Sequence, residues 1–245
     1  MKNYMAIVQY DGSKYSGWQR QDKNDKTIQH KIEQVISKMV GKLISINGSG
    51  RTDASVHALG QVINFKIMTE MSEEEIKTYL NEYLPMDIRI MSVKRVEDRF
   101  HARLSAKSKR YTYHIINNEN MNIFRRQYTY HLVKKLDIKA MNEAIPYLEG
   151  THDFAAFTSK KNSKKSSIRT IKNINITEKD GEIEIEFVGD GFLYHMVRIL
   201  VGTLIEVGYH EKSPIEIMSI IESKERAKAG YLVPGHGLFL DEVNY

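Results

Sequence analysis

A single carboxylate, Asp53, lies in the glycine-rich segment GSGRTDASVHALG of residues 48–60, two positions after Arg51. A carboxylate that stays ionised can act as a nucleophile or as a base. The segment lacks the Gly-Lys-Ser/Thr end of a phosphate-binding Walker loop, and strand-like residues follow it, whereas a dinucleotide-binding loop opens a helix. Asp and Gly are also ordinary turn formers, so on spacing alone the segment is more typical of a structural turn.

Arg198 favours a chemical role for this carboxylate. It lies in the middle of FLYHMVRILVGTLIEV, residues 192–207, a predicted helix that is apolar nearly all round and is therefore expected to be buried. A buried guanidinium is costly unless a carboxylate pairs with it. Asp53 is one candidate partner. Glu206 lies two turns further along the same helix, but its carboxylate can simply be exposed at the helix end. A nearby cation favours the ionised form of a carboxyl group, which is the form that a nucleophile needs.

The basic residues are concentrated in the middle of the chain. The 245 residues include 36 Lys and Arg and 31 Asp and Glu, a net charge of +5. Residues 99–169 hold 15 basic against 5 acidic residues, whereas the remainder has a net charge of −5. Two stretches without acids, 99–110 and 158–170, flank a predicted strand that carries Tyr111. Lys and Arg neutralise phosphates and aromatic rings stack on unpaired bases, so the pattern suggests RNA binding. The alternative is a pair of solvated surface loops.

The elements that must position these residues alternate along the chain. The turn Asp180-Gly181 predicts a hairpin, and Thr27 and Ser72 are candidate helix N-caps. Interspersed strands and helices with visible hairpins predict an α+β fold with a mainly antiparallel sheet. We expect two halves built on one plan, residues 1–104 with the Asp53 loop and 105–245 with a basic RNA-binding loop. The predicted strands are 5–10, 42–47, 61–67, 87–96, 109–116, 171–177, 182–188 and 237–240, and the predicted helices are 27–40, 72–83, 137–148, 192–207 and 213–222.

Composition excludes several classes of protein. The chain has no cysteine, which excludes disulfides and thiolate metal sites. Its nine histidines are dispersed and form no HExxH motif, so no metal site is expected. No apolar run approaches the roughly 20 residues that a membrane span needs, and the N-terminal residues lack the features of a signal peptide. We therefore expect a cytoplasmic protein that does not bind membranes.

Five separated blocks, in the same order, resemble the tRNA pseudouridine synthase A family. GRTDASVHALGQV resembles the family signature GRTDAG-VHA. The other blocks are YDGSKYSGWQRQ (10–21), FHARLSAKSKRYTYHI (100–115), GTHDFAAFTS with SIRT (150–159 and 167–170), and FLYHMVRILVGTLIEVG with GLFL (192–208 and 237–240). The resemblance covers nearly the whole chain.

The resemblance implies a fold and a set of roles. The fold would be two ferredoxin-like (RRM-like) halves joined into one mainly antiparallel sheet, with the active cleft between them. Asp53 would be the catalytic aspartate and Tyr111 the tyrosine that stacks on the target uracil. Arg198 would pair with the aspartate, in agreement with the argument from burial, and Arg51 would help to fill the space left by the flipped base. The remaining candidate RNA contacts are His101, Arg103, Arg110, Lys160, Lys161, Lys164, Lys165 and Arg169.

The implied reaction is the isomerisation of uridine to pseudouridine at positions 38, 39 and 40 of the tRNA anticodon stem-loop, by a homodimer. It needs neither a cofactor nor a metal. The residues do not choose between covalent attack of Asp53 on the sugar and a glycal route, nor show which tRNAs are modified or whether this is a main or a second copy of the enzyme. Ser55 replaces the family's glycine, which would strain the loop if this position needs a positive φ. The alternatives are a non-catalytic tRNA-binding or chaperone-like protein and, less favoured, a glycosidase, since the loop has no second acid.

Overall fold

The computed structural model describes residues 1–22, 24–160 and 166–245, so the predicted contacts Lys161, Lys164 and Lys165 lie outside the described residues. The fold is α+β with mainly antiparallel strand pairing. The chain divides into two compact units. Unit 1 comprises Met1–Lys107 and Phe239–Tyr245, and unit 2 comprises Ser108–Leu238.

Unit 1 is a sheet covered by two helices. Its elements are β1 (Lys2–Tyr10), α1 (Ile28–Val40), β2 (Asn47–Gly48), β3 (His57–Ile67), α2 (Glu73–Tyr83), β4 (Ile88–Val96) and β10 (Leu238–Asn244). From β1 to β4 this is the β-α-β-β-α-β order of the ferredoxin-like motif. Strand β1 lies between β4 and β3 and pairs antiparallel with both. The other edge of β3 pairs antiparallel with β2 and parallel with β10.

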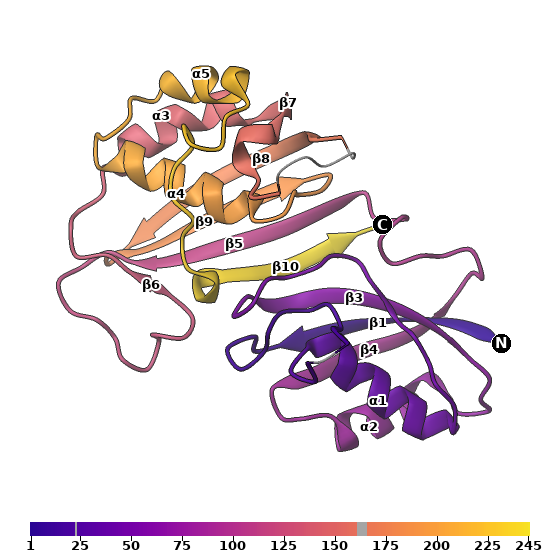
Figure 1. Cartoon of the computed structure of the whole chain (residues 1–245). Helices are drawn as coiled ribbons and strands as arrows, with labels where there is room; N and C mark the ends of the chain where they lie inside the picture. Colours follow the sequence, from indigo (N-terminus) through magenta and orange to yellow (C-terminus); the bar gives the residue numbers. More distant parts are fainter. Residues whose placement is uncertain (23, 161–165) are drawn as a thin grey trace. The chain divides into compact units, whose positions relative to one another are not determined.

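Alternation along β1 explains how this unit folds. Tyr4, Ala6, Val8 and Tyr10 are buried at every second position, so they share one face of the strand. The helices α1 and α2 contact one another and lie below the strands of this unit in Figure 1. Each helix buries an apolar stripe at helical spacing, which consists of Ile28, Ile32 and Ile36 in α1 and Ile76 and Leu80 in α2.

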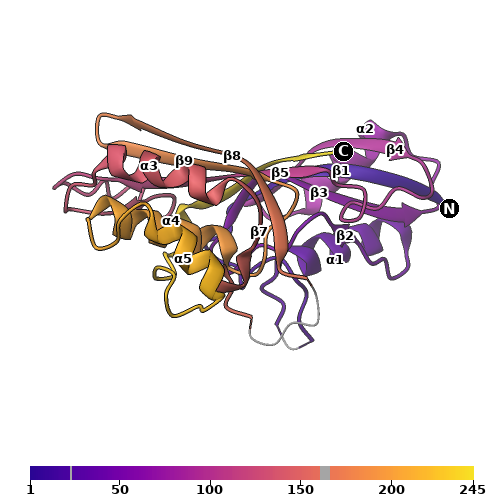
Figure 2. The ribbon, with the colours of Figure 1, turned by 90° about the horizontal axis from the view of Figure 1, so that it is seen from above.

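Unit 2 has the strand order β5-β9-β8-β7, with β6 paired to β5. Tyr111, Tyr113 and Ile115 of β5 are all buried, as the predicted alternation requires. The helices α3, α4 and α5 lie together on one side of these strands (Figure 1, Figure 2). The elements are β5 (Ser108–Ile116), β6 (Tyr130–His131), α3 (Ile138–Leu148), β7 (Gly150–Asp153), η1 (Phe154–Phe157), β8 (Ile168–Lys179), β9 (Glu182–Gly189), α4 (Met196–Gly208), α5 (Glu216–Ser223) and η2 (Gly235–Gly237).

The structure confirms most predicted elements and corrects four details. Thr27 precedes α1, but its side chain makes no capping hydrogen bond. Only Asn47–Gly48 of the predicted strand 42–47 is a strand, whereas residues 57–60 of the predicted loop begin β3 because β1 and β10 pair with them. The predicted helix 192–207 begins only at Met196, since His195 has a φ of +66°. In the described ranges no helix is both long and apolar enough to cross a membrane.

Candidate active site

The Asp53 loop is fixed by the N-terminal block of residues 10–21. The backbone N–H of Trp18 donates to the carbonyl oxygen of Thr52 at 3.0 Å. The hydroxyl groups of Tyr10 and Thr52 share a hydrogen bond of 2.8 Å. Asp53 itself is half-buried, and its carbonyl oxygen accepts from the N–H of Val56 at 3.2 Å. The backbone around the candidate carboxylate is therefore held by hydrogen bonds from other parts of the chain.

Tyr10 and Trp18 form the apolar support of this loop. Both are buried, and their rings lie 6.0 Å apart. Burial raises the pKa of Tyr10 well above its usual value, so its hydroxyl group stays protonated next to Thr52. Asp11 accepts hydrogen bonds from the N–H and hydroxyl of Ser13. Trp18 therefore packs in the core, and Asp11 forms a turn with Ser13.

Ser55, the departure from the family signature, has a φ of +63°. This is the left-handed region, in which a residue with a Cβ atom is strained by about 1–2 kcal/mol. The expectation that a positive φ here would strain the loop therefore applies to this chain. The backbone N–H of Ser55 donates to the carbonyl oxygen of Tyr15 at 3.4 Å, which ties this strained position to the N-terminal block.

Replacing Ser55 with Gly should raise the free energy of unfolding by about 0.5–1 kcal/mol, because the strain removed exceeds the entropy that glycine adds to the unfolded chain. Urea denaturation of the two proteins measures the difference. Ser16→Gly is the matched control, because Ser16 is exposed, lies in the N-terminal block and does not have a positive φ. It should lower stability. If both substitutions lowered stability equally, the strain at Ser55 would be negligible.

His57 lies at the base of the loop and is buried. Its Nδ1 accepts from the N–H of Gly12 at 3.1 Å and lies 3.2 Å from the carboxylate of Asp11. The His57 ring stacks on Phe239 of β10, with ring centroids 4.6 Å apart. Within the described part of the chain, no three His, Asp or Glu side chains are grouped as metal ligands. His57 therefore joins the loop to the C-terminal strand of unit 1.

Arg51 and Tyr111 differ in exposure and belong to different units. Arg51, on the Asp53 loop of unit 1, is exposed. Tyr111 belongs to unit 2, where it pairs with Phe187 of β9. Its side chain is 7% exposed, and the ring of Phe192 contacts it edge-on with centroids 5.3 Å apart. Phe192 therefore restricts the orientation of the Tyr111 ring.

Arg198 is half-buried on α4, not fully buried as its apolar helix predicts. Its Nε donates to the carbonyl oxygen of Val233 at 2.8 Å. Glu206, the alternative partner from the sequence, accepts from the N–H of Tyr231 at 3.1 Å and from Lys212 Nζ at 3.3 Å. It is therefore not an exposed helix-end residue, and these contacts account for its carboxylate. Sequence reasoning missed the Val233 carbonyl, because a backbone acceptor leaves no mark on residue type.

The basic stretch 99–110 begins in a loop that a buried amide pair holds. Asn3 and Asn64 are at most 3% exposed, and Asn64 Nδ2 donates to Asn3 Oδ1 at 3.1 Å. Asn64 Oδ1 accepts from the N–H of Ala102 at 2.9 Å, and Asn3 Nδ2 donates to the carbonyl oxygen of Phe100 at 3.0 Å. These bonds fix the backbone around the candidate RNA contact His101, and sequence reasoning did not identify this support.

The other candidate RNA contacts that the structure describes differ in exposure and in their contacts with other groups. Arg103 and Lys160 are exposed. Arg110 lies 3.8 Å from the carboxylate of Glu186, and Nη1 of Arg169 donates to the carbonyl oxygens of Ser166 and Ile168. The exposed cations are therefore the better placed to contact a phosphate.

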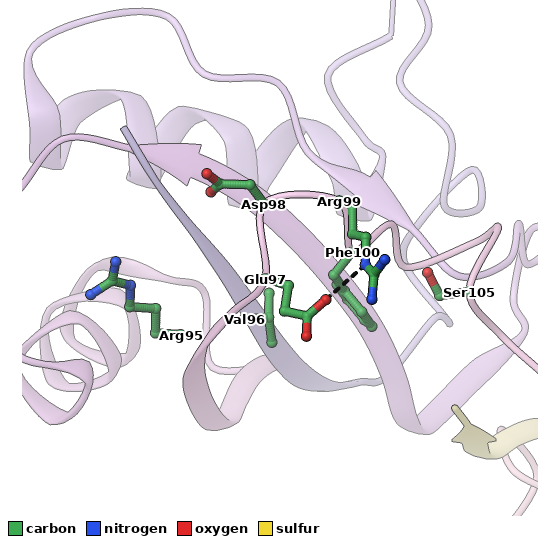
Figure 3. A pocket seen from close by; sticks show the side chains of 7 residues that line it. All are labelled: Arg95, Val96, Glu97, Asp98, Arg99, Phe100 and Ser105. Atoms are coloured by element: carbon green, nitrogen blue, oxygen red, sulfur yellow. Dashed lines mark hydrogen bonds and ion pairs between the residues drawn. The ribbon is translucent and has the colours of Figure 1, made fainter.

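A surface pocket of about 800 Å³ lies in unit 1 at the end of β4 (Figure 3). The ion pair Glu97–Arg99, at 2.8 Å, spans part of it. Its walls carry both charges and include none of the residues to which we assign chemistry. The lining residues are Arg95, Val96, Glu97, Asp98, Arg99, Phe100 and Ser105.

Comparison with known proteins adds a decisive observation. A family model described as tRNA pseudouridine synthase matches residues 6–105 and 144–245. A "tRNA pseudouridine synthase A" of Bacillus sp. (strain KSM-64) is 50% identical over 245 residues, which are all of this chain and all of the relative. The chain belongs to the tRNA pseudouridine synthase family. As a member, it is an isomerase.

Two further relatives of this synthase carry a number in their names. "tRNA pseudouridine synthase A 2" of Bacillus anthracis is 48% identical and "tRNA pseudouridine synthase A 1" of Clostridium tetani is 47% identical, each over the full length of both chains. A solved structure titled "Crystal Structure of a Cbf5-Nop10-Gar1 Complex" covers 83% of this chain and 45% of its own, with 12% identity and a TM-score of 0.39. That likeness is too low to support an argument.

The family model matches some residues of the candidate site and not others. It includes Arg51, Asp53 and Arg198, but not residues 106–143 and therefore not Tyr111. The full-length relatives nevertheless align over that stretch. Within this synthase, the Asp53 loop belongs to unit 1, whereas Tyr111 and Arg198 belong to unit 2.

Proposed function

We propose that this synthase converts uridine to pseudouridine at positions 38, 39 and/or 40 of the tRNA anticodon stem-loop, with Asp53 as the nucleophile or base. The observation that carries the proposal is the fixed Asp53 loop, held by Trp18 and Tyr10, in a chain 50% identical to a tRNA pseudouridine synthase A. A preorganised carboxylate reacts without the entropy cost of first being ordered.

The reaction exchanges one glycosidic bond for another. The bond between N1 of uracil and C1′ of the ribose breaks, the detached uracil turns, and a bond forms between C5 and C1′. The proton on C5 then leaves, and N1 gains a proton. Asp53 either attacks C1′ to form an ester, which C5 of the detached uracil then displaces, or takes a proton from C2′ to give a glycal and returns that proton when C5 bonds to C1′. Because the atoms of the substrate are only rearranged, no oxidant, reductant or metal is required.

The proposal gives the other residues binding roles. Tyr111 stacks on the detached uracil, a contact worth roughly 1–3 kcal/mol per base. Arg198 is the cation that pairs with Asp53, and Arg51 helps to fill the space left when the uridine flips out of the stem, which costs a few kcal/mol. The proposal thus requires Asp53 of unit 1 and Tyr111 and Arg198 of unit 2 to act on one bound uridine.

One experiment separates this function from its alternatives. The protein is incubated with tRNA that carries tritium at C5 of uridine, and the released tritium, the nucleosides and any free uracil are measured. An active synthase releases tritium and forms pseudouridine. Tight tRNA binding without release would indicate a non-catalytic RNA-binding protein, and free uracil would indicate a glycosidase. Transcripts with a single uridine at 38, 39 or 40 then identify the positions that are modified.

The basic stretch 158–170 should supply phosphate contacts. Replacing Lys160, Lys161, Lys164 and Lys165 together with Gln should reduce the slope of log Kd against log salt by up to about 3, since each lost phosphate contact removes roughly 0.7–0.9. Binding of tRNA is measured between low and moderate salt. Replacing the same four residues with Arg keeps their charge and should keep the slope. An unchanged slope in the Gln variant would mean that this stretch is only solvated.

The proposal also includes a homodimer, with tRNA lying across both subunits. Large apolar side chains are unusually exposed in one segment of unit 2, and contiguous exposed apolar residues are typical of interaction sites. Light scattering at micromolar concentrations should give the mass of two chains, and the mass of one chain at every concentration would contradict a dimer. The exposed side chains are Met121, Ile123, Phe124, Tyr128 and Val133.

A further inference from the structure

A strap, defined here as residues 229–234, crosses α4 within unit 2. Its backbone lies directly against the helix, because a Cβ atom added at Gly202 would lie 1.9 Å from the carbonyl oxygen of Tyr231. Only glycine permits this approach. Val233 of the strap is fully buried. The strap is therefore packed into unit 2 and is not a loose connection.

Side chains of α4 hold the first half of the strap. Thr203 is fully buried, and its hydroxyl oxygen accepts from the N–H of Gly230 at 2.9 Å. The same hydroxyl donates to the carbonyl oxygen of Ile199 at 2.8 Å, so both its donor and its acceptor are used. The Glu206 carboxylate accepts from the N–H of Tyr231. Two successive N–H groups of the strap are thus anchored to one helix.

The second half of the strap accepts hydrogen bonds from Arg198 of the candidate site and from a tyrosine of β5. The carbonyl oxygen of Val233 accepts from Nε of Arg198, and that of Pro234 accepts from the hydroxyl of Tyr113 at 2.8 Å. Burial raises the pKa of Tyr113 far above its usual value, so this hydroxyl stays protonated and can donate. Tyr113 lies two residues after Tyr111 on β5. One segment therefore ties the helix that carries Arg198 to the strand that carries Tyr111.

The bond at Nε determines how Arg198 can act. A guanidinium is a planar fork with five N–H donors, so fixing Nε sets the orientation of the plane that contains the two terminal nitrogens. Packing alone does not require this bond, because apolar contacts bury Val233 whichever group its carbonyl oxygen accepts from. The orientation matters if the terminal nitrogens must meet a carboxylate or a substrate.

We propose that the strap is a positioning element for Arg198, and that Thr203 is a positioning residue that acts through it. The proposal rests on the function proposed above. The hydroxyl of Thr203 fixes the position of the strap on α4 through its hydrogen bond to Gly230. The strap in turn places the carbonyl oxygen of Val233 where it orients Arg198. A misplacement of about 1 Å in such a group can cost on the order of a hundredfold in rate.

Thr203→Val tests the proposal, because valine has the shape of threonine without the hydroxyl. Single-turnover tritium release should fall about ten- to hundredfold, while the Kd for tRNA stays within about twofold. Thr203→Ser keeps the hydroxyl and should restore the rate to within about threefold. In an Arg198→Ala background, Thr203→Val should cause no further loss, because the group that it positions is gone.

A second variant keeps the proposal testable if Thr203→Val does not fold. Nη1 of Arg226 donates to the carbonyl oxygens of Ala229 and Gly230, so Arg226→Gln loosens the strap and leaves the sequence of α4 unchanged. It should lower the rate at least about threefold, again only when Arg198 is present. Urea denaturation of each variant shows whether it is folded under the assay conditions.

The outcomes separate the two proposals. If the wild type releases tritium and both strap variants react at its rate, the strap has no positioning role. If either variant slows the reaction equally with and without Arg198, its effect is structural and the strap proposal is wrong. If the wild type releases no tritium, the proposed function fails and the strap proposal fails with it.

Discussion

Replacing Asp53 with Asn should lower tritium release from C5-labelled tRNA by at least about a thousandfold, with the Kd for tRNA changed by less than about threefold. Asn keeps the shape of the side chain but can neither attack C1′ nor accept a proton as a carboxylate does. Loss of a nucleophile that acts in the reaction lowers the rate far more than the binding of substrate. Single-turnover assays with tRNA in the presence of excess enzyme measure the rate directly.

Asp25→Asn is the matched control for this substitution. Asp25 belongs to unit 1, lies outside both the N-terminal block and the Asp53 loop, is largely exposed and pairs with His30 at 3.3 Å. Its variant should react within about twofold of the wild-type rate. Tritium release by Asp53→Asn at more than a tenth of that rate would remove Asp53 from the chemistry. A large loss of tRNA binding would instead assign Asp53 to RNA recognition.

Gly17→Ala should damage both stability and activity, because this residue packs against the Asp53 loop. Gly17 has a φ of +95°, and an added Cβ atom would lie 2.7 Å from the carbonyl oxygen of Thr52 and 3.1 Å from the carbonyl carbon of Asp53. Backbone strain and the clash together should cost about 2–4 kcal/mol in the free energy of unfolding. Displacement of the loop should lower the rate by about a hundredfold. Urea denaturation and tritium release measure the two effects.

Gly41→Ala separates strain from displacement of the loop. Gly41 follows α1 and also has a positive φ, +70°, but an added Cβ atom would have no neighbour within 4 Å among the residues that the structure describes. Alanine at this position should cost about 1 kcal/mol in stability and leave the rate unchanged. If Gly17→Ala lost no more activity than Gly41→Ala, the N-terminal block would not position Asp53.

Local patterns in the sequence predicted the elements whose signals are local. Ser72 and Glu75 form the capping box of α2, and Asp180 and Gly181 both have positive φ in the turn between β8 and β9. These structures depend on residues that are neighbours in sequence, so residue type and spacing are enough to identify them. The buried face of β5 followed in the same way from the alternation of Tyr111, Tyr113 and Ile115.

Features set by distant parts of the chain were not predictable in this way. Residues 57–60 end the glycine-rich segment 48–60, which is typical of a loop, but pairing with β1 and β10 makes them part of a strand. The apolar helix around Arg198 indicated burial, but not its extent or the backbone acceptor on Val233. Asp53, Arg51 and Tyr111 were singled out by residue type together with resemblance, and their roles stay predictions until the variants are measured.

The placement of β10 has a consequence for synthesis of the protein on the ribosome. Unit 1 is discontinuous: Phe239 stacks on His57, Leu240 pairs with Ala58, and the Tyr245 hydroxyl donates to the carbonyl oxygen of Ala102 at 2.6 Å. The ribosome synthesises the Asp53 loop and its N-terminal support long before it synthesises Phe239, Leu240 and Tyr245. Unit 2 therefore can complete its packing before unit 1 does, although translation begins with unit 1. The loop that carries Asp53 acquires its last structural support only when translation reaches the final strand.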